Sequence, residues 1–459
     1  MSTTARPLVV LNIVGLTPSL LGINTPHINR VIADGFLATL DGVFPAVTCT
    51  TQASMLTGKL PTEHGIVANG WYFRDLAEIW LWRQSNHLVK GEKVWEQARK
   101  EFKEFSCAKM FWWYNMYSTA DYSVTPRPLY PADGRKIMGI YTAPAELRQT
   151  LEKDLGPFPM FNFWGPAADI RSSEWIAASA KKTFDLHQPT LSLVYLPHLD
   201  YNLQRLGPND PAIAEDVAAI DRVAGDLINH FRAKGAEVLI VSEYGIEPAD
   251  GHVHINRILR ENGYLAVQQS LSWELLDAGA SRAFAVADHQ VAHIYIADSR
   301  DIPKVRRLLE QTPGIERVLG SEEKASWGVA HQNSGELVAI AEPHHWFTYY
   351  YWLDENSAPD FATSVDIHRK PGYDPVELFL DPSLRFPKLK IGWRLLQKQL
   401  GFRMLMDVIP LTPNLVKGTH GRLPGSTEHG PLLISSRKEL AKDCYSMLDV
   451  KDLIIRHHH

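Results

Sequence analysis

This chain of 459 residues has few cysteines, no long apolar run and no excess of positive charge. Its three cysteines, Cys49, Cys107 and Cys444, are odd in number and widely spaced, so they exclude a disulfide framework. Such sparse cysteine usage favours a reducing compartment. We therefore predict a cytoplasmic protein.

The remaining two absences limit the partners. The N-terminal apolar run, residues 8–16, is shorter than a membrane-spanning helix and lacks a basic leader or a small-residue cleavage site, so it predicts a buried first strand. The formal net charge of -5 supplies no basic field for nucleic acid or anionic lipid. We predict a small-molecule substrate as partner, with no nucleic acid and no membrane. The oligomeric state stays open.

What is present is the composition of a globular protein, with 45% apolar and 22% charged residues. The length suffices for one large domain that carries an insertion. The final residues 457–459 are all histidine and are interpreted as the remnant of a purification tag.

Short apolar runs alternate with helical patterns in the first half of the chain. The runs are LVVLNIVGL, LSLVYLPHL and VLIVSEYG, and a helical pattern follows each of them. This alternation predicts parallel strands with crossover helices, and so a three-layer α/β domain. Ligands bind beyond the carboxyl ends of such strands, where Val14, Asp200 and Glu243 fall. These three positions are expected to meet in one pocket.

From residue 284 the pattern changes to paired strands around a charged helix, typical of a small α+β unit. We predict a cap insertion at 266–362 between two parts of a core, 1–265 and 363–456.

Five segments share a recognisable motif pattern. They are LNIVGLTPSLL near residue 11, FPAVTCTTQASMLTG near 44, YLPHLDYNLQRLGP near 195, VLIVSEYGI near 238 and KGTHG at 417–421. Together they resemble the alkaline phosphatase superfamily, in particular its type I phosphodiesterase/nucleotide pyrophosphatase branch. The resemblance spans most of the chain. It implies an alkaline-phosphatase-like core with a mainly parallel central sheet, and a hydrolase of phosphodiester or pyrophosphate bonds.

The resemblance also implies two zinc ions that activate a Thr or Ser nucleophile, but several ligand positions are altered here. The altered positions read Val14, Gln204, Glu243 and Tyr244. Valine offers no lone pair and tyrosine is a poor neutral ligand, whereas zinc prefers Cys, His and carboxylate. A divergent member without the two-zinc centre is therefore expected.

Three positions match the family pattern unchanged: Thr48, Asp200 and His420. Asp200, Gln204 and His420 would form the one remaining ligand set, which suits a harder ion such as magnesium or calcium better than zinc. We predict at most one divalent ion. Asn12 lies two residues before Val14, on the same face of a regular strand, and is a candidate for a further oxygen ligand.

The candidate catalytic residues are Thr48, Asp200, Glu243 and His420. Thr48 holds the family's nucleophile position at the start of a helix, where backbone N–H groups favour an anion, although a threonine there also serves as an N-cap. Asp200 and Glu243 are acid/base candidates, because two close carboxylates push their pKa values apart. They are alternatively a polar pair left from a lost metal site. His420, in a glycine-rich loop, is a candidate acid/base, ligand or donor.

The candidate substrate-binding residues are Asn69, Trp71, Gln204 and Tyr244. By resemblance Asn69 lies near the transferred phosphoryl group, and otherwise it is a turn residue. Tyr244 and Gln204 can donate hydrogen bonds to a substrate. Trp71 belongs to an aromatic stretch, and the whole chain has 13 tryptophans. Such aromatic side chains could stack on a sugar, cyclitol or nucleoside ring, or they could simply pack in the core.

Three functions remain open. The first is a phosphodiester or pyrophosphate hydrolase of a small sugar-, cyclitol- or nucleotide-like substrate that does not use the two-zinc mechanism. The second is a metal-independent, glycosidase-like hydrolase in which Asp200 and Glu243 form the required carboxylate pair. The third is a non-catalytic protein that binds a small molecule in the same pocket.

Overall fold

The computed structural model describes residues 5–132 and 136–459. Its centre is a nine-stranded mixed sheet with strand order β21-β2-β20-β9-β1-β8-β5-β6-β7. In chain order these strands are β1 (Leu8–Ile13), β2 (Phe36–Asp41), β5 (Cys107–Met110), β6 (Tyr122–Pro126), β7 (Ile140–Ala143), β8 (Leu191–Leu196), β9 (Glu237–Val241), β20 (Leu432–Ser435) and β21 (Cys444–Ser446). The run from β9 to β6 is parallel, while β20 and β7 join antiparallel.

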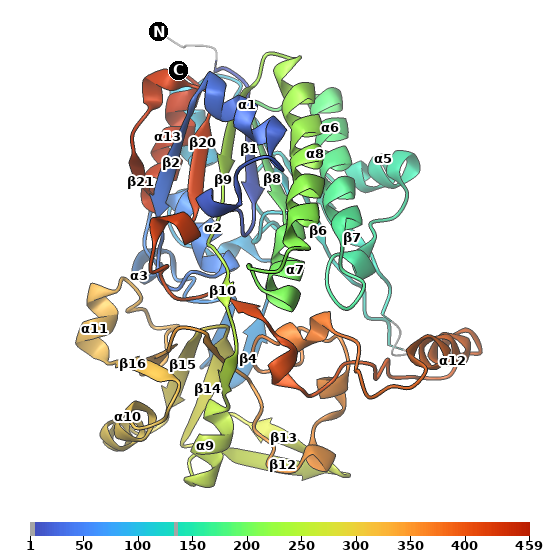
Figure 1. The fold of residues 1–459 in the computed structure, drawn as a ribbon, viewed down its shortest axis with the longest axis vertical. Coiled ribbons are helices and arrows are strands. Elements are labelled where there is room, and N and C mark those ends of the chain that lie inside the picture. The colour runs from blue at the N-terminus through green and yellow to red at the C-terminus, as the bar shows by residue number, and fades with distance from the viewer. Residues whose placement is uncertain (1–4, 133–135) are drawn as a thin grey trace.

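Helices cover both faces of this sheet, which confirms the predicted three-layer α/β fold (Figure 1). One layer holds α1 (Pro26–Asp34), α5 (Glu146–Leu155), α6 (Ile170–His187), α7 (His198–Leu206) and α8 (Ile213–Arg232). The opposite layer holds α2 (Thr48–Thr57), α4 (Val94–Glu101) and α13 (Val450–His457). A short helix, α3 (Pro61–His64), follows α2.

Strand β1 shows why the centre of the sheet forms as it does. All six of its residues, LVVLNI, are buried between β8 and β9, as expected for an apolar strand covered on both faces. The strand ends in a sharp turn where Gly15 has φ of +75°, a conformation that favours glycine. A Cβ at Gly15 would lie 2.9 Å from Leu203 Cδ1, so the turn also brings the backbone close to α7.

The lower lobe in Figure 1 contains a four-stranded antiparallel sheet of order β14-β15-β17-β16. Its strands are β14 (Ala283–Asp288), β15 (Val291–Ile296), β16 (Ile315–Leu319) and β17 (Leu337–Ala341), and its helices are α10 (Ile302–Glu310) and α11 (Ser321–Ser326). These elements form the expected α+β cap and lie inside 266–362. The domain boundaries themselves stay predictions.

The remaining short strands and helices lie outside these two sheets. They are β3 (Gly70–Phe73), β4 (Glu78–Leu81), β10 (Glu247–Pro248), β11 (Gly251–Val253), α9 (Ile255–Glu261), β12 (Ala266–Ser270), β13 (Trp273–Asp277), β18 (His345–Phe347), α12 (Pro387–Gln399) and β19 (Gly418–Thr419). The β10–β19 pair matters most for the site, because it holds the segment before His420 against the exit of β9.

The C-terminal histidines continue helix α13. His457 is buried, and its ring nitrogens hydrogen-bond to Ser435 Oγ at 2.8 Å and to the Leu453 carbonyl at 2.8 Å. The interpretation of residues 457–459 as a tag remnant stays a prediction.

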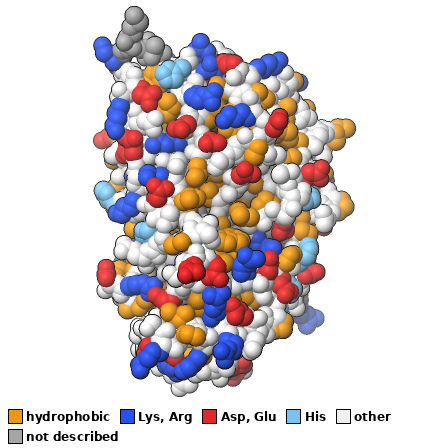
Figure 2. Space-filling view, turned by 90° about the vertical axis from the view of Figure 1, so that its left-hand side faces the viewer, with side chains coloured by type: hydrophobic (Ala, Val, Ile, Leu, Met, Phe, Trp, Pro, Cys, Tyr) orange, Lys and Arg blue, Asp and Glu red, His pale blue; other side chains and the backbone are white. Residues whose placement is uncertain are grey.

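On the face shown in Figure 2, acidic and basic side chains are interspersed, with no broad field of one sign. Among the described residues, none of the helices combines the length and apolar character needed to cross a bilayer.

Candidate active site

The ends of several elements bring five predicted site residues together. Thr48 is the first residue of α2, Asp200 lies in the first turn of α7 after β8, and Glu243 and Tyr244 follow β9. His420 follows β19. All five side chains are buried. The convergence at the carboxyl ends of parallel strands agrees with the general rule for such sheets.

Tyr244 links the nucleophile position to a carboxylate. Its hydroxyl lies 2.9 Å from Thr48 Oγ1 and donates to Asp200 Oδ1 at 3.4 Å. The other oxygen of Asp200 accepts from Gln204 Nε2 at 2.8 Å. The side chains therefore form a continuous hydrogen-bonded chain from Thr48 through Tyr244 to Asp200.

Glu243 is fully buried and held by two amides. Its Oε1 accepts from Asn12 Nδ2 and from Gln52 Nε2, both at 2.6 Å. Gln52 was not predicted as a site residue, although it lies one helical turn after Thr48 in α2 and so on the same face. Asn12, a candidate ligand, instead directs its amide nitrogen at the Glu243 carboxyl.

Burial is the main cause of the altered acidities at the site. It raises the pKa of Glu243 to about 8, against the lowering effect of hydrogen bonds from Gln52, Asn12 and Thr48. It likewise raises the pKa of Asp200 to about 7. We expected mutual repulsion to split the two pKa values. Instead both are raised, because loss of hydration outweighs the repulsion between the carboxylates.

The raised pKa of Glu243 predicts a pH-dependent stability. Between the pKa of an unfolded glutamate, ~4.3, and about 8, the folded chain keeps a proton that the unfolded chain has lost. The Glu243 contribution is thus fully present below ~4.3 and is lost as the pH rises through about 8. Glu243→Gln, a neutral isostere, should flatten the fall in unfolding free energy between ~pH 5 and ~8, measured by urea titration. Exposed Glu261→Gln is the control and should keep the parent slope; an unchanged slope in Glu243→Gln would refute this assignment.

Tyr244 also begins a stack of four buried rings. Its ring lies 3.7 Å from that of His420, with an angle of 10° between the ring planes. The His420 ring lies 3.6 Å from His289, which in turn lies 3.8 Å from Tyr373. His289 and Tyr373 could not be predicted as site residues, because stacking between distant segments leaves no local signal in the sequence. The stack lies next to Asp200, whose carboxylate accepts from the Tyr244 hydroxyl.

The His420 ring is neutral at neutral pH. Burial lowers its pKa to about 3, and Nδ1 carries the proton because its partner at 2.8 Å is the Ala46 carbonyl, which can only accept. A neutral imidazole can accept a proton but is a poor general acid. The catalytic assignment of His420 stays a prediction.

The residues present do not fit a pair of zinc ions. Val14 is buried apolar core and offers no donor, and the Tyr244 hydroxyl lies between Thr48 and Asp200. In the proposed single-ion set, the amide nitrogen of Gln204 faces Asp200, while its oxygen accepts from Tyr373 at 3.1 Å. The described residues contain no group of three or more His, Cys, Asp or Glu side chains placed to hold a metal ion. A single ion would have to displace these hydrogen bonds.

Asn69 and Trp71 lie beside the site. The polar atoms of Asn69 hydrogen-bond to other residues of the protein, and the ring of Trp71 packs against another side chain. Asn69 donates to the Asp288 carboxylate from its backbone nitrogen at 2.8 Å and from Nδ2 at 3.1 Å, and its Oδ1 accepts from the Cys49 nitrogen at 2.9 Å. Trp71 is buried and stacks on Phe73 with ring centres 5.2 Å apart. Their role in substrate binding stays a prediction. Asp288, the partner of Asn69, was not predicted from the sequence.

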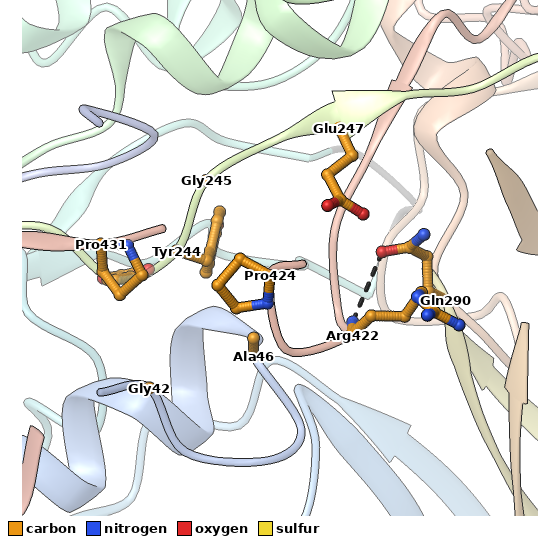
Figure 3. A pocket seen from close by; sticks show the side chains of 10 residues that line it. Gly42, Ala46, Tyr244, Gly245, Glu247, Gln290, Arg422, Pro424 and Pro431 are labelled. Atoms are coloured by element: carbon orange, nitrogen blue, oxygen red, sulfur yellow. Dashed lines mark hydrogen bonds between the residues drawn. The ribbon is translucent and has the colours of Figure 1, made fainter. Parts of the chain in front are cut away.

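A small pocket opens next to Tyr244 (Figure 3). Gln290, Arg422 and Glu247 line its polar side, and the backbone nitrogen of Arg422 donates to Gln290 Oε1 at 3.4 Å. The cavity volume is about 10 Å³, which admits about one water molecule. A larger ligand would have to displace side chains to enter this pocket.

Comparisons with known proteins show what this chain is similar to. The family model for type I phosphodiesterase/nucleotide pyrophosphatase matches residues 8–374. A Schizosaccharomyces pombe protein named as an uncharacterized pyrophosphatase/phosphodiesterase is 22% identical over 244 residues, which cover 51% of this chain and 41% of the relative. The match thus spans less than half the length of that curated relative.

Solved structures show the same fold. Murine ectonucleotide pyrophosphatase/phosphodiesterase 5 in complex with AMP superimposes with a TM-score of 0.60 at 15% identity, covering 98% of this chain and 94% of that one. Phosphonoacetate hydrolase from Sinorhizobium meliloti, in complex with phosphonoformate, gives a TM-score of 0.61 at 13% identity, covering 99% and 96%. These names give no support to the glycosidase-like alternative. The chain belongs to the type I phosphodiesterase/nucleotide pyrophosphatase family, within the alkaline phosphatase superfamily.

Proposed function

We propose that this protein hydrolyses a phosphodiester or pyrophosphate bond in a small sugar-, cyclitol- or nucleotide-like molecule, without the two-zinc centre of its family. The observation that carries the proposal is the hydrogen-bonded chain from Thr48 through Tyr244 to Asp200 at the start of α2. Membership of a family named for this chemistry supports it.

In the proposed first step Thr48 Oγ1 bonds to phosphorus as the bond to the leaving oxygen breaks. The Thr48 proton passes to the Tyr244 hydroxyl, whose own proton moves to Asp200, and the leaving oxygen takes a proton from solvent. Tyr244 stays a neutral donor, because burial and the nearby Asp200 and Glu243 raise its pKa. Backbone N–H groups in the first turn of α2 would favour the phosphoryl anion.

In the second step water attacks the phosphothreonine. The Thr48–phosphorus bond breaks, Asp200 returns its proton to Thr48 through Tyr244, and the surplus proton of the water leaves to solvent. Asp200 suits this relay because its pKa of about 7 leaves it partly ionised at neutral pH.

The proton relay from Thr48 through Tyr244 to Asp200 predicts how kcat depends on pH and how it responds to chelators. With bis(p-nitrophenyl) phosphate as substrate, kcat should rise as the pH increases through about 7, where Asp200 ionises and can accept a proton. Asp200→Asn should lower kcat by about 100-fold or more and abolish this rise. EDTA should leave the parent rate unchanged.

Asp288→Asn is the matched control, since burial also raises the pKa of Asp288 to about 7 but its carboxylate contacts Asn69 and lies outside the relay. It should keep the pH rise. Loss of activity in EDTA, with recovery on adding zinc, would refute the protein-only mechanism.

The non-catalytic alternative also has a specific observation in its favour. The altered positions Val14, Gln204, Glu243 and Tyr244 leave no zinc pair to activate Thr48, and the described residues contain no group of three or more His, Cys, Asp or Glu side chains placed to hold a metal ion. If the protein only binds, a nucleotide or sugar phosphate should raise its melting temperature, with no turnover in the parent chain at any pH.

A further inference from the structure

Helix α12 (Pro387–Gln399) projects from the side of the molecule, on the right of Figure 1. None of its 13 residues is buried. The helix lies far along the chain from the catalytic residues of α2 and α7 and takes no part in the proposed reaction. Its exposed surface therefore needs a separate explanation.

The outward face of α12 is apolar. Leu389, Trp393, Leu396 and Leu400, at the end of the helix, are 70%, 58%, 44% and 64% exposed. Their spacing of four, three and four residues places them on one side of a helix. Phe386 and Phe402 extend the row at either end and are 59% and 65% exposed. This row forms a continuous strip of large apolar side chains in contact with solvent.

The opposite face anchors the helix to the protein. Ile391 packs against a small hydrophobic cluster that includes Val376 and Val408. Lys390 and Arg394 both pair with Asp407, at 3.0 and 2.9 Å. These contacts determine which side faces outward, so exposure of the apolar strip is a property of the fold.

The charged residues of the segment that carries the strip are all basic. Residues 385–403 contain six lysines and arginines and no acidic residue. Of these cations, Lys388, Lys398 and Arg403 make no ion pair with another described residue. Basic side chains around an apolar face that carries Trp, Phe and Leu are the composition of helices that lie in a membrane interface.

We propose that α12 docks the protein on an anionic lipid surface, with the strip of Leu389, Trp393, Leu396 and Leu400 entering the interface. A helix of 13 residues is about 20 Å long, shorter than the ~30 Å hydrocarbon core, so it lies along the interface and does not cross it. A second copy of the chain is disfavoured as the occupant, because a symmetric contact would bring these cations together.

The proposal departs from our expectation, drawn from the sequence, of no membrane partner. That expectation rested on the net charge of -5 for the whole chain. Surface attraction depends on charge within about 10 Å, the Debye length at moderate salt, so the local charge of 385–403 decides it.

The test is flotation of the full chain with vesicles of phosphatidylglycerol and phosphatidylcholine, compared with phosphatidylcholine alone. The protein should float with the anionic vesicles, and binding should weaken as salt increases. Leu389→Glu combined with Leu396→Glu should lower the vesicle partition coefficient at least ~10-fold, as should Lys388→Glu with Lys398→Glu. All four residues are exposed, so unchanged melting temperatures would show that the variants fold.

Leu271→Glu is the control, because Leu271 is 89% exposed but lies in the β12–β13 turn away from α12. It should bind as the parent does. Absence of flotation with anionic vesicles, or equal binding by the α12 variants, would overturn the proposal. So would a dimer in solution that the Leu389/Leu396 variant disrupts, because α12 would then be a contact between copies.

Discussion

Thr48→Ala is expected to lower kcat on a phosphodiester by at least ~1,000-fold, because it removes the attacking hydroxyl while leaving the fold in place. The structure supports this expectation through the contact of Thr48 Oγ1 with the Tyr244 hydroxyl at 2.9 Å. Thr48→Ser keeps a hydroxyl and should retain much of the activity. Steady-state kinetics on the purified variants measure both effects.

Thr50→Ala is the matched control for this substitution. Thr50 is equally buried in α2, but its hydroxyl donates to the Ile66 carbonyl at 3.2 Å and takes no part in the relay. Its kcat should stay near that of the parent. If Thr48→Ala retained the parent rate, Thr48 would not be the nucleophile.

Lys370→Met is expected to destabilise the fold by about 3–5 kcal/mol, because it leaves buried carboxylates without their counter-ion. Lys370 Nζ lies 2.7 Å from Asp374 Oδ2 and 2.8 Å from Glu377 Oε1, and each of the three side chains is at most 2% exposed. Methionine preserves the volume of the aliphatic stem but not the charge. Urea unfolding measures the change.

Lys304→Met provides the comparison for that measurement. Lys304 is 68% exposed and lies 3.7 Å from Asp301, so its loss should change the unfolding free energy by no more than ~0.5 kcal/mol. Equal stability of the two variants would mean that the buried triad contributes nothing net to the fold.

The parallel centre of the sheet was predictable because each strand carries its own signal. The apolar run in β1 and its counterparts in β8 and β9 indicate strands buried on both faces. The antiparallel strand β20 was not predictable, because it begins at residue 432 and pairs with β2, which begins at residue 36. No local pattern reports a pairing between segments so far apart.

The grouping of Thr48, Asp200, Glu243 and Tyr244 followed from the family motifs and from the position of strand ends. Their mutual hydrogen bonds did not, since these depend on side-chain directions. The pKa values of Asp200 and Glu243 also differ from the expectation, which was based on repulsion between neighbouring carboxylates. Complete burial of both groups dominates their pKa values instead.

The most direct test of the central claim is to measure metal content and turnover on the same sample, purified without chelators. Metals are quantified by mass spectrometry and kcat is measured on bis(p-nitrophenyl) phosphate. A site built on Thr48, Tyr244 and Asp200 predicts turnover with far less than one zinc ion per chain. Two zinc ions per chain, with activity that rises and falls with their removal and return, would contradict it.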